Sequence, residues 1–322
     1  MIRRRATTVA ALAVLLVAGA WGWREYLGWR VSAAVHALRR VPPRRLGICR
    51  CAPDSTIQFR RDGLRLVADL YGVGPSPRPP VLLLHGLTPY GKDLPLYHVL
   101  ARRLADAGFL VLAMDFAGYG ESDDPYTVGI PEALDARRDV RAAVAVLDSL
   151  PASAGLVTLL GHSMGAVEAM SVGLGDPRVG AVVALGPPRR TAEVLATPEG
   201  RDYHWNRIRR TYDSVYHHPL PKWFTREQFL NLKALRDIER YRDEWAREEH
   251  VPLLLVDGSR ESSADREYLA RYAAGVRPPA RYVTIPDADH YLNSGRIGEL
   301  FYYDRAAVGE LVDEIRRLAA SP

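Results

Sequence analysis

Short runs of apolar residues alternate with amphipathic stretches from about residue 56 to the end of the chain. Continuous apolar runs are typical of strands buried on both faces of a sheet, whereas apolar positions at helical spacing predict amphipathic helices. The predicted strands cover residues 81–84, 109–114, 157–163, 179–185, 252–256 and 280–285. The predicted helices cover residues 96–107, 131–150 and 305–319. This alternation predicts an α/β fold with a doubly wound, mostly parallel sheet.

Two segments depart from the alternation inside this domain, which we place at residues 51–322. Residues 56–60 and 64–71 flank the turn dipeptide Asp62-Gly63, so a β-hairpin is expected there. Residues 191–250, which we call the helical insertion, are helical in composition and dense in Arg, Tyr and Trp. A long insert in a compact domain is usually a lid or a binding element. The alternative is a packed helical segment that does not contact the substrate.

The first fifty residues form a separate unit in the pattern. Residues 6–23 are eighteen uncharged, mostly apolar residues that follow arginines at positions 3–5. A helix of that length reaches about 27 Å, near the lower limit for crossing a bilayer. Trp21 and Trp23 resemble an interfacial aromatic belt and favour an uncleaved anchor, with the body weakly favoured on the extracytoplasmic side. A signal peptide cleaved after residues 18–20 and a buried soluble helix are the alternatives.

The distribution of charge argues against a nucleic-acid partner. The formal net charge is +5, but ten arginines lie within the first fifty residues. The rest of the chain is close to neutral or slightly acidic, so no basic face covers the main body.

Cys49 and Cys51 are the only cysteines. With one residue between them a mutual disulfide is expected to be strained, and no nearby histidines complete a zinc site. Pairing between chains, attachment of a lipid and free thiols remain as alternatives, so the cysteines do not indicate the compartment.

The strongest chemical signal is the sequence Gly161-His162-Ser163-Met164-Gly165. It follows a predicted strand and precedes a segment with several Ala and Val, which is the context of a nucleophile elbow. Gly161 and Gly165 suit this turn because a bulky side chain two residues from the serine would clash. Ser163 is therefore the candidate nucleophile.

Five segments together resemble the α/β-hydrolases, specifically the serine hydrolases of esterase, lysophospholipase and serine-aminopeptidase type. They are the His85-Gly86 loop, residues 115–122, residues 161–165, the turn at Gly258, and His290. The resemblance covers residues 56–320 and implies an α/β-hydrolase fold. It says little about the substrate, because this fold hosts many chemistries.

The resemblance also implies a catalytic triad. His290 occupies the last position in the order serine, acid, histidine. The matching acid position, three residues after Gly258, holds Glu261, where most relatives have Asp. Asp257 and Asp265 are the alternatives for this acid, whose role is to hold the imidazole tautomer and stabilise the imidazolium.

The expected oxyanion hole consists of the backbone N–H groups of Leu87 and Met164. Candidates for further substrate contacts are His85, Thr88, Tyr90 and His162. No metal-ligand cluster and no phosphate-binding Gly-rich loop occurs in the sequence, so no metal and no cofactor are expected.

Together these features predict a membrane-anchored serine hydrolase that acts on a small-molecule or lipid ester through an acyl-enzyme. Lysophospholipids are candidates because an anchor would place the site near lipid. A serine aminopeptidase, an amidase and a thioesterase are alternative enzymes, and a non-catalytic anchored binding protein is an alternative of another class. The sequence leaves the oligomeric state open.

Overall fold

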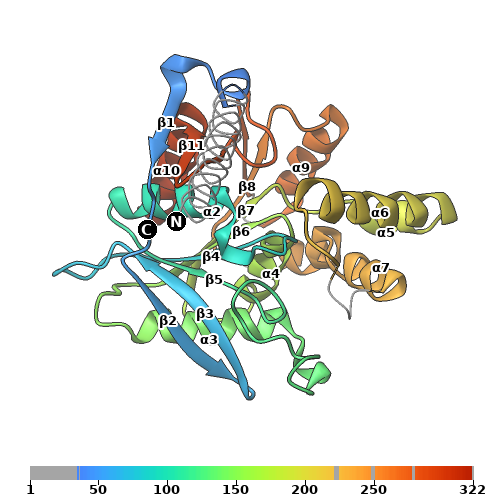
Figure 1. Cartoon of the computed structure of the whole chain (residues 1–322), viewed down its shortest axis with the longest axis horizontal. Coiled ribbons are helices and arrows are strands. Elements are labelled where there is room, and N and C mark those ends of the chain that lie inside the picture. Colours follow the sequence, from blue (N-terminus) through green and yellow to red (C-terminus); the bar gives the residue numbers. More distant parts are fainter. Residues whose placement is uncertain (1–34, 36, 221–224, 248–250, 278–279, 321–322) are drawn as a thin grey trace, which may run out of the picture.

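A central sheet organises the domain, and we describe it from a computed structural model (Figure 1). The model describes residues 35, 37–220, 225–247, 251–277 and 280–320. The strands of the sheet are β2 (Ser55–Arg61), β3 (Leu64–Tyr71), β4 (Pro80–Leu84), β5 (Leu110–Met114), β6 (Val157–His162), β7 (Val179–Leu185), β8 (Leu253–Gly258) and β9 (Arg281–Ile285). Within the described residues its eight strands lie in the order β2-β3-β5-β4-β6-β7-β8-β9. The pairs β2–β3 and β3–β5 are antiparallel and the others are parallel, which confirms the predicted mostly parallel sheet.

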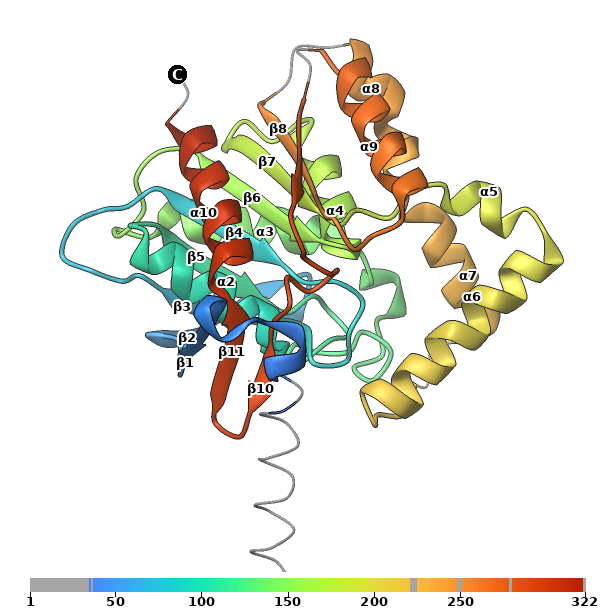
Figure 2. The same ribbon diagram turned by 90° about the horizontal axis from the view of Figure 1, so that it is seen from above.

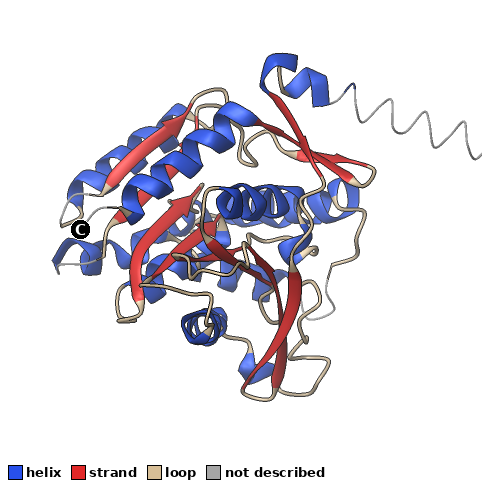
Figure 3. Cartoon of the chain, turned by 90° about the vertical axis from the view of Figure 1, so that its left-hand side faces the viewer, coloured by secondary structure: helices blue, strands red, loops and turns tan. Residues whose placement is uncertain are grey.

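Helices cover both faces of this sheet (Figure 3). On one face lie α2 (Pro95–Asp106) and α10 (Arg305–Ala319), and on the other lie α3 (Ala136–Ser149), α4 (Met164–Gly173) and α9 (Ser263–Gly275). Side chains alternate between the faces along each strand. Leu82 and Leu84 therefore pack with α3 and α4, and Val81 and Leu83 pack with α2 and α10. All four leucine and valine side chains are buried, which explains the continuous apolar run.

The helix predicted at residues 131–150 is shorter than expected. A 3-10 turn covers Pro131–Ala133, and α3 begins only at Ala136. The carboxylate of Asp135 accepts the backbone N–H groups of Arg137 and Arg138 and so caps α3. An aspartate at this position starts a new helix because it satisfies N–H groups that have no intrahelical acceptor.

A small antiparallel sheet joins the connector after the N-terminal segment to the C-terminal part of the chain. It consists of β1 (Leu46–Cys49), β11 (Leu300–Asp304) and β10 (Gly295–Ile297), with β11 in the middle. Ala37 and Val41 are buried against Tyr302 of β11. Described residues between 37 and 49 thus pack with the main domain, although the sequence pattern places a boundary at residue 50.

Two arginines of this connector contact the loop after β9. Arg45 Nη1 lies 3.0 Å from Asp287 Oδ2, and Arg40 Nη1 lies 3.4 Å from Asp289 Oδ2. Arg45 also lies 2.5 Å from the buried carboxylate of Asp304 at the end of β11. The connector is therefore held by the loop as well as by the small sheet.

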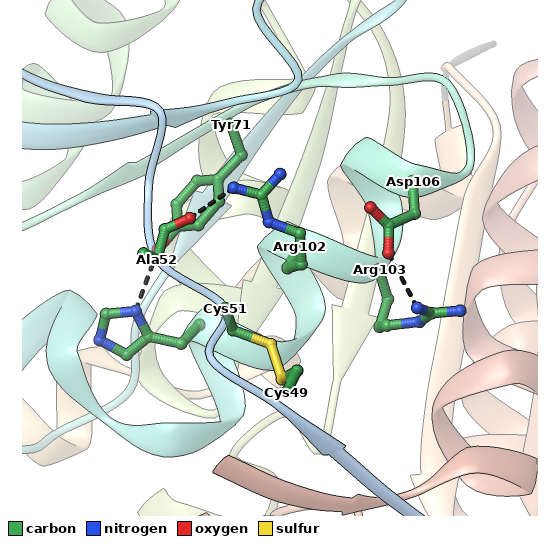
Figure 4. The surroundings of a disulfide bond; sticks show 8 residues. Cys49, Cys51, Ala52, Tyr71, Arg102, Arg103 and Asp106 are labelled. Atoms are coloured by element: carbon green, nitrogen blue, oxygen red, sulfur yellow. Dashed lines mark hydrogen bonds and ion pairs between the residues drawn. A yellow bond between two sulfur atoms is a disulfide. The ribbon is translucent and has the colours of Figure 1, made fainter. Parts of the chain in front are cut away.

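Cys49 and Cys51 form a disulfide with each other, in contrast to the strain expected from their spacing (Figure 4). Cys51 has φ 52°, which turns the chain and leaves the two Cα atoms 5.3 Å apart. That separation is ordinary for a disulfide. Cys51 is buried in the core on the α2 side, where Arg102 donates a hydrogen bond to the carbonyl oxygen of Ala52.

The helical insertion is helical in the structure, and its helices α5, α6 and α7 project beyond the sheet (Figure 2). It contains α5 (Thr191–Leu195), α6 (Pro198–Arg210), a π-helical turn (Thr211–Val215), α7 (Arg226–Leu235), a 3-10 turn (Ile238–Tyr241) and α8 (Arg242–Arg247). A hydrophobic cluster of its own is formed by Leu195, Ile208, Tyr212, Tyr216, Phe229 and Leu230. Leu87, in the loop after β4, packs against this cluster and so connects the insertion to the sheet.

Within the described part of the chain, no helix combines the length and the apolar character needed to span a bilayer. The predicted anchor at residues 6–23 lies outside the described residues.

Candidate active site

Ser163 lies at the turn from β6 into α4, with φ 52° and ψ −116°. A residue other than glycine adopts such a conformation only when its surroundings hold it there. The neighbouring glycines permit the turn: a Cβ at Gly161 would lie 2.1 Å from the carbonyl oxygen of Gly165, and one at Gly165 would lie 2.5 Å from that of Leu84. The turn therefore places Ser163 at the carboxyl ends of the parallel strands, at the N-terminus of α4.

His290 and Glu261 meet between the loops that follow β9 and β8. His290 Nδ1 lies 3.0 Å from Glu261 Oε1. Because an ionised carboxylate only accepts, Nδ1 carries the hydrogen and Nε2 of the neutral ring carries the lone pair. The hydrogen bond from His290 is the main cause that lowers the pKa of Glu261, and the charge of Arg189 adds to it. Glu261 is therefore ionised at neutral pH.

The two alternative acids bind an arginine instead of His290. Arg189 Nη2 lies 3.0 Å from Asp257 Oδ2, and Arg189 Nε lies 3.3 Å from Asp265 Oδ1. The same guanidinium is 3.9 Å from Glu261. Burial raises the pKa of Asp257 to about 6. Arg189 thus offsets the repulsion among three carboxylates that lie beside His290.

A cavity of about 460 Å³ extends from Ser163 to the helical insertion. Ser163, His290 and Glu261 line it, together with Leu87 and Met164. The N–H of Met164 is the first of α4, and N–H groups of a first helical turn have no intrahelical acceptor. Among the described residues, the N–H of Leu87 also has no hydrogen-bond acceptor. Both groups are therefore available to a ligand, and the N-terminus of α4 favours negative charge there.

His162, next to the nucleophile, connects three loops through hydrogen bonds. Its Nε2 lies 2.9 Å from the carbonyl oxygen of His290, and its Nδ1 lies 2.8 Å from the hydroxyl of Tyr97. The N–H of Gly86 donates to the same hydroxyl at 2.6 Å. Since a carbonyl only accepts, Nε2 carries the hydrogen and Tyr97 donates to Nδ1. Burial lowers the pKa of His162 well below its ordinary value, so the ring stays neutral and this tautomer is fixed.

His85, Thr88, Tyr90 and His162, the candidates for further substrate contacts, are not among the described residues that line the cavity. His85 is buried, its Nε2 accepts the N–H of Phe116 at 3.1 Å, and burial lowers its pKa to about 4. Thr88 is buried as well, and the Tyr90 hydroxyl donates to the carbonyl oxygen of Tyr216. Like His162, these residues hold the loops of the site in place.

Sequence reasoning misses two residues of the site, Arg189 and Tyr97. Arg189 follows Pro187-Pro188 at the start of an Arg-rich segment, and no motif distinguishes it from its neighbours. Tyr97 lies in the first turn of α2, where its apolar ring fits the helix pattern and conceals the role of its hydroxyl. Within the described chain, no group of three or more His, Cys, Asp or Glu side chains is arranged to hold a metal ion.

Residues 81–296 match the model of the alpha/beta hydrolase family. The match covers more than half of the chain and includes most of β4, the turn at Ser163, and His290. The chain therefore belongs to the α/β-hydrolase family, as its motifs predict.

The curated relatives share only part of their length with this chain. A monoacylglycerol lipase of Mycolicibacterium smegmatis is 33% identical over 127 residues, which are 39% of this chain and 43% of the lipase. A 2-hydroxy-6-oxononadienedioate/2-hydroxy-6-oxononatrienedioate hydrolase of Burkholderia vietnamiensis is 35% identical over 107 residues, 33% and 35% of the two chains. The solved structure of Est1E from Butyrivibrio proteoclasticus with ferulic acid has a TM-score of 0.55 at 17% identity, and covers 82% of this chain and 97% of its own. At that identity the likeness concerns the fold alone.

Proposed function

We propose that this protein is a serine hydrolase that cleaves carboxylic esters through an acyl-enzyme. The observation that carries the proposal is the hydrogen bond between His290 and Glu261 in a cavity that Ser163 also lines from a nucleophile elbow. A serine hydroxyl at its ordinary pKa needs an adjacent base, and a base needs a partner that fixes its tautomer. The pairing of His290 with Glu261 in the cavity that Ser163 lines supports this assignment of roles.

In the acylation step the hydroxyl of Ser163 attacks the ester carbonyl and passes its proton to Nε2 of His290. The resulting oxyanion accepts hydrogen bonds from the N–H groups of Leu87 and Met164. Glu261 stabilises the imidazolium that forms. The tetrahedral intermediate then expels the alcohol, which takes the proton from His290.

In the deacylation step His290 accepts a proton from water, and the hydroxide attacks the acyl group on Ser163. Collapse of the second intermediate releases the carboxylic acid and returns the proton to the serine oxygen. The same machinery cleaves thioesters and amides in other enzymes, so a thioesterase and an aminopeptidase or amidase are the alternatives within this chemistry.

We favour lipid esters, including lysophospholipids, for two reasons. The predicted anchor at residues 6–23 would keep the site at a membrane surface. In addition, one relative is named for the hydrolysis of monoacylglycerols. The helical insertion, which lines the cavity with residues from α6 and α7, is our candidate for a lid over such a substrate.

The proposal is tested with the variant Ser163→Ala and the control Ser171→Ala, a serine near the other end of α4. We expect wild type and Ser171→Ala to hydrolyse p-nitrophenyl butyrate and to be labelled by a fluorophosphonate probe. Ser163→Ala should lose both properties and keep its melting temperature. A folded Ser163→Ala protein with near wild-type turnover would overturn the mechanism. A wild-type protein that neither reacts nor is labelled would favour the non-catalytic alternative.

A further inference from the structure

Two cationic side chains face the cavity without a compensating partner. Lys233 on α7 and Arg207 on α6 both line it. Among the residues that the structure describes, neither the ammonium of Lys233 nor the guanidinium of Arg207 has a hydrogen bond or an ion pair. Lys233 is partly buried, so water solvates it less than it solvates a surface lysine. Arg207 is exposed, so water solvates its charge, but the partly buried, unpaired ammonium of Lys233 is costly unless a ligand supplies the missing charge.

The carboxylates near Lys233 and Arg207 have other partners. Glu261 and Asp265 line the catalytic end of the cavity and share Arg189. The carboxylate of Asp237 is buried and accepts the backbone N–H groups of Thr191 and Glu239. Among the described residues, the end of the cavity under the insertion therefore has no lining carboxylate of its own.

A third cation, Arg236, has a weak partner. Arg236 Nε lies 3.6 Å from Glu168 Oε1, which is a long ion pair, and burial raises the pKa of Glu168. An ion pair at that distance offsets less of the positive charge of Arg236 than a direct contact does. The insertion end of the cavity thus carries an excess of positive charge from Arg207, Lys233 and Arg236.

The pKa values of neighbouring groups agree with this geometry. Burial lowers the pKa of Lys233 to about 8, and the charges of Arg207 and Arg236 contribute in the same direction, more than Asp237 opposes them. Burial together with the charges of Lys233 and Arg207 lowers the pKa of His204, on α6, to about 4. An anion bound between α6 and α7 would relieve the repulsion at both positions.

We propose that Lys233 and Arg207 bind an anionic substituent of the substrate, a carboxylate or a phosphate carried on the part of the ester away from the scissile carbonyl. This inference rests on the proposed ester hydrolysis and adds the class of ester. The cavity volume of about 460 Å³ is in the range of small-molecule sites, so it holds both the reacting group and a charged substituent.

Two matched substrate pairs test the proposal on the full-length protein. The first pair is p-nitrophenyl hemiglutarate and p-nitrophenyl methyl glutarate, which differ in one acyl-side carboxylate. The second pair is 1-acylglycerol 3-phosphate and 1-acylglycerol, which differ in one alcohol-side phosphate. We expect kcat/KM of wild type to favour the anionic member of at least one pair by about tenfold or more, the size of one or two charge-assisted hydrogen bonds. The pair that shows the preference identifies the source of the anion.

Variants then assign the preference to the two cations. Lys233→Met and Arg207→Met should each lower the ratio of anionic to neutral kcat/KM towards one, and Lys233→Arg should restore part of it. The control Arg209→Met, an exposed position on α6 outside the cavity lining, should keep the wild-type ratio. Melting temperatures show that the compared variants are folded.

The outcomes are distinguishable. If the neutral esters are hydrolysed but neither pair shows a preference, or if Lys233→Met and Arg207→Met both keep it, the anion site is wrong and the ester hydrolase stands. If no ester of either pair is hydrolysed while the protein is folded, the proposed function itself fails. A fluorophosphonate labelling experiment on the same sample reports on Ser163 independently.

Discussion

The acid that contacts His290 is a glutamate, one methylene longer than the aspartate that most proteins resembling this chain have there. Its carboxylate reaches Nδ1 of His290 from the loop after β8, and Arg189 lies on its other side. The two aspartates near Glu261, Asp257 and Asp265, form ion pairs with Arg189.

Glu261→Gln should lower turnover by at least roughly a hundredfold, because an amide stabilises the imidazolium less and can select the wrong tautomer. Glu261→Asp should recover part of the activity, limited by its shorter reach. Steady-state kinetics with p-nitrophenyl esters measure both changes. The control Asp265→Asn should stay within about tenfold of wild type. If Asp265→Asn is crippled and Glu261→Gln is nearly normal, Asp265 is the acid of the triad.

Lys233 gives the molecule a specific dependence of stability on pH. Its pKa is lowered to about 8 in the folded protein, whereas an unfolded chain has an ordinary lysine pKa of about 10.4. Between these values the unfolded state binds more protons, so this lysine makes the free energy of unfolding rise with pH there. Lys233→Met, which keeps most of the length of the side chain and removes the charge, should melt above wild type at pH 7. This advantage should shrink as the pH approaches 10.

Thermal melts of wild type, Lys233→Met and the control Arg209→Met at a series of pH values measure this difference. Arg209→Met should differ from wild type by a constant amount across the series, because arginine does not titrate there. A constant difference for Lys233→Met as well would show that the lysine titrates at its ordinary pKa.

Single residues also show how far sequence alone can go at the site. The glycines of the elbow and the order of Ser163, Glu261 and His290 are visible because the chemistry constrains residue type and spacing along the chain. Arg189 and Tyr97 act through contacts between segments far apart in sequence. An arginine among many arginines, or a tyrosine in a helix, carries no local sign of such a contact.

At the scale of elements, the helical insertion has its own hydrophobic cluster and also lines the cavity. Phe229 and Leu230 of α7 are both buried in that cluster, but only Phe229 is among the described residues that line the cavity. Substituting Phe229 and Leu230 one at a time therefore distinguishes a role in packing from a role in substrate selection.

Phe229→Ala should enlarge the cavity and shift the preference among p-nitrophenyl esters towards longer acyl chains. Leu230→Ala should cost about 2–5 kcal/mol of stability, as large-to-small core substitutions do, and should leave the chain-length preference of the folded protein unchanged. Kinetics across a C2–C12 ester series, with melting temperatures, measure both. If Phe229→Ala leaves the preference unchanged too, the insertion is structural packing.

The strands differ in the same way. Some can be predicted from the local sequence, whereas others form only through contacts with distant segments. The inner strands β4 to β8 are predicted within a few residues because burial on both faces leaves a continuous apolar run. Strands β2 and β3 are predicted from the turn dipeptide between them. The small sheet is not predicted, since β1 and β10 are short, largely half-exposed or exposed strands without such a run. They form only because β11 lies between them in space.

At the scale of the whole molecule, we propose that residues 6–23 hold the protein in a membrane. The full-length chain should then stay in the membrane fraction after an alkaline carbonate wash, because a spanning helix resists extraction whereas a peripheral protein does not. Fractionation with N-terminal sequencing measures this. A soluble protein that begins near Trp21 would establish the cleaved signal peptide instead.

The pairing of Arg40 and Arg45 with Asp289 and Asp287 determines where the chain can be shortened for such experiments. A version that starts at residue 51 removes both arginines, strand β1 and the disulfide partner of Cys51. It leaves an unpaired edge on β11 and releases the loop that ends at His290. Weak activity of that fragment would report damage from trimming and not the chemistry of the enzyme. A start at residue 35 keeps these contacts and removes the whole predicted anchor.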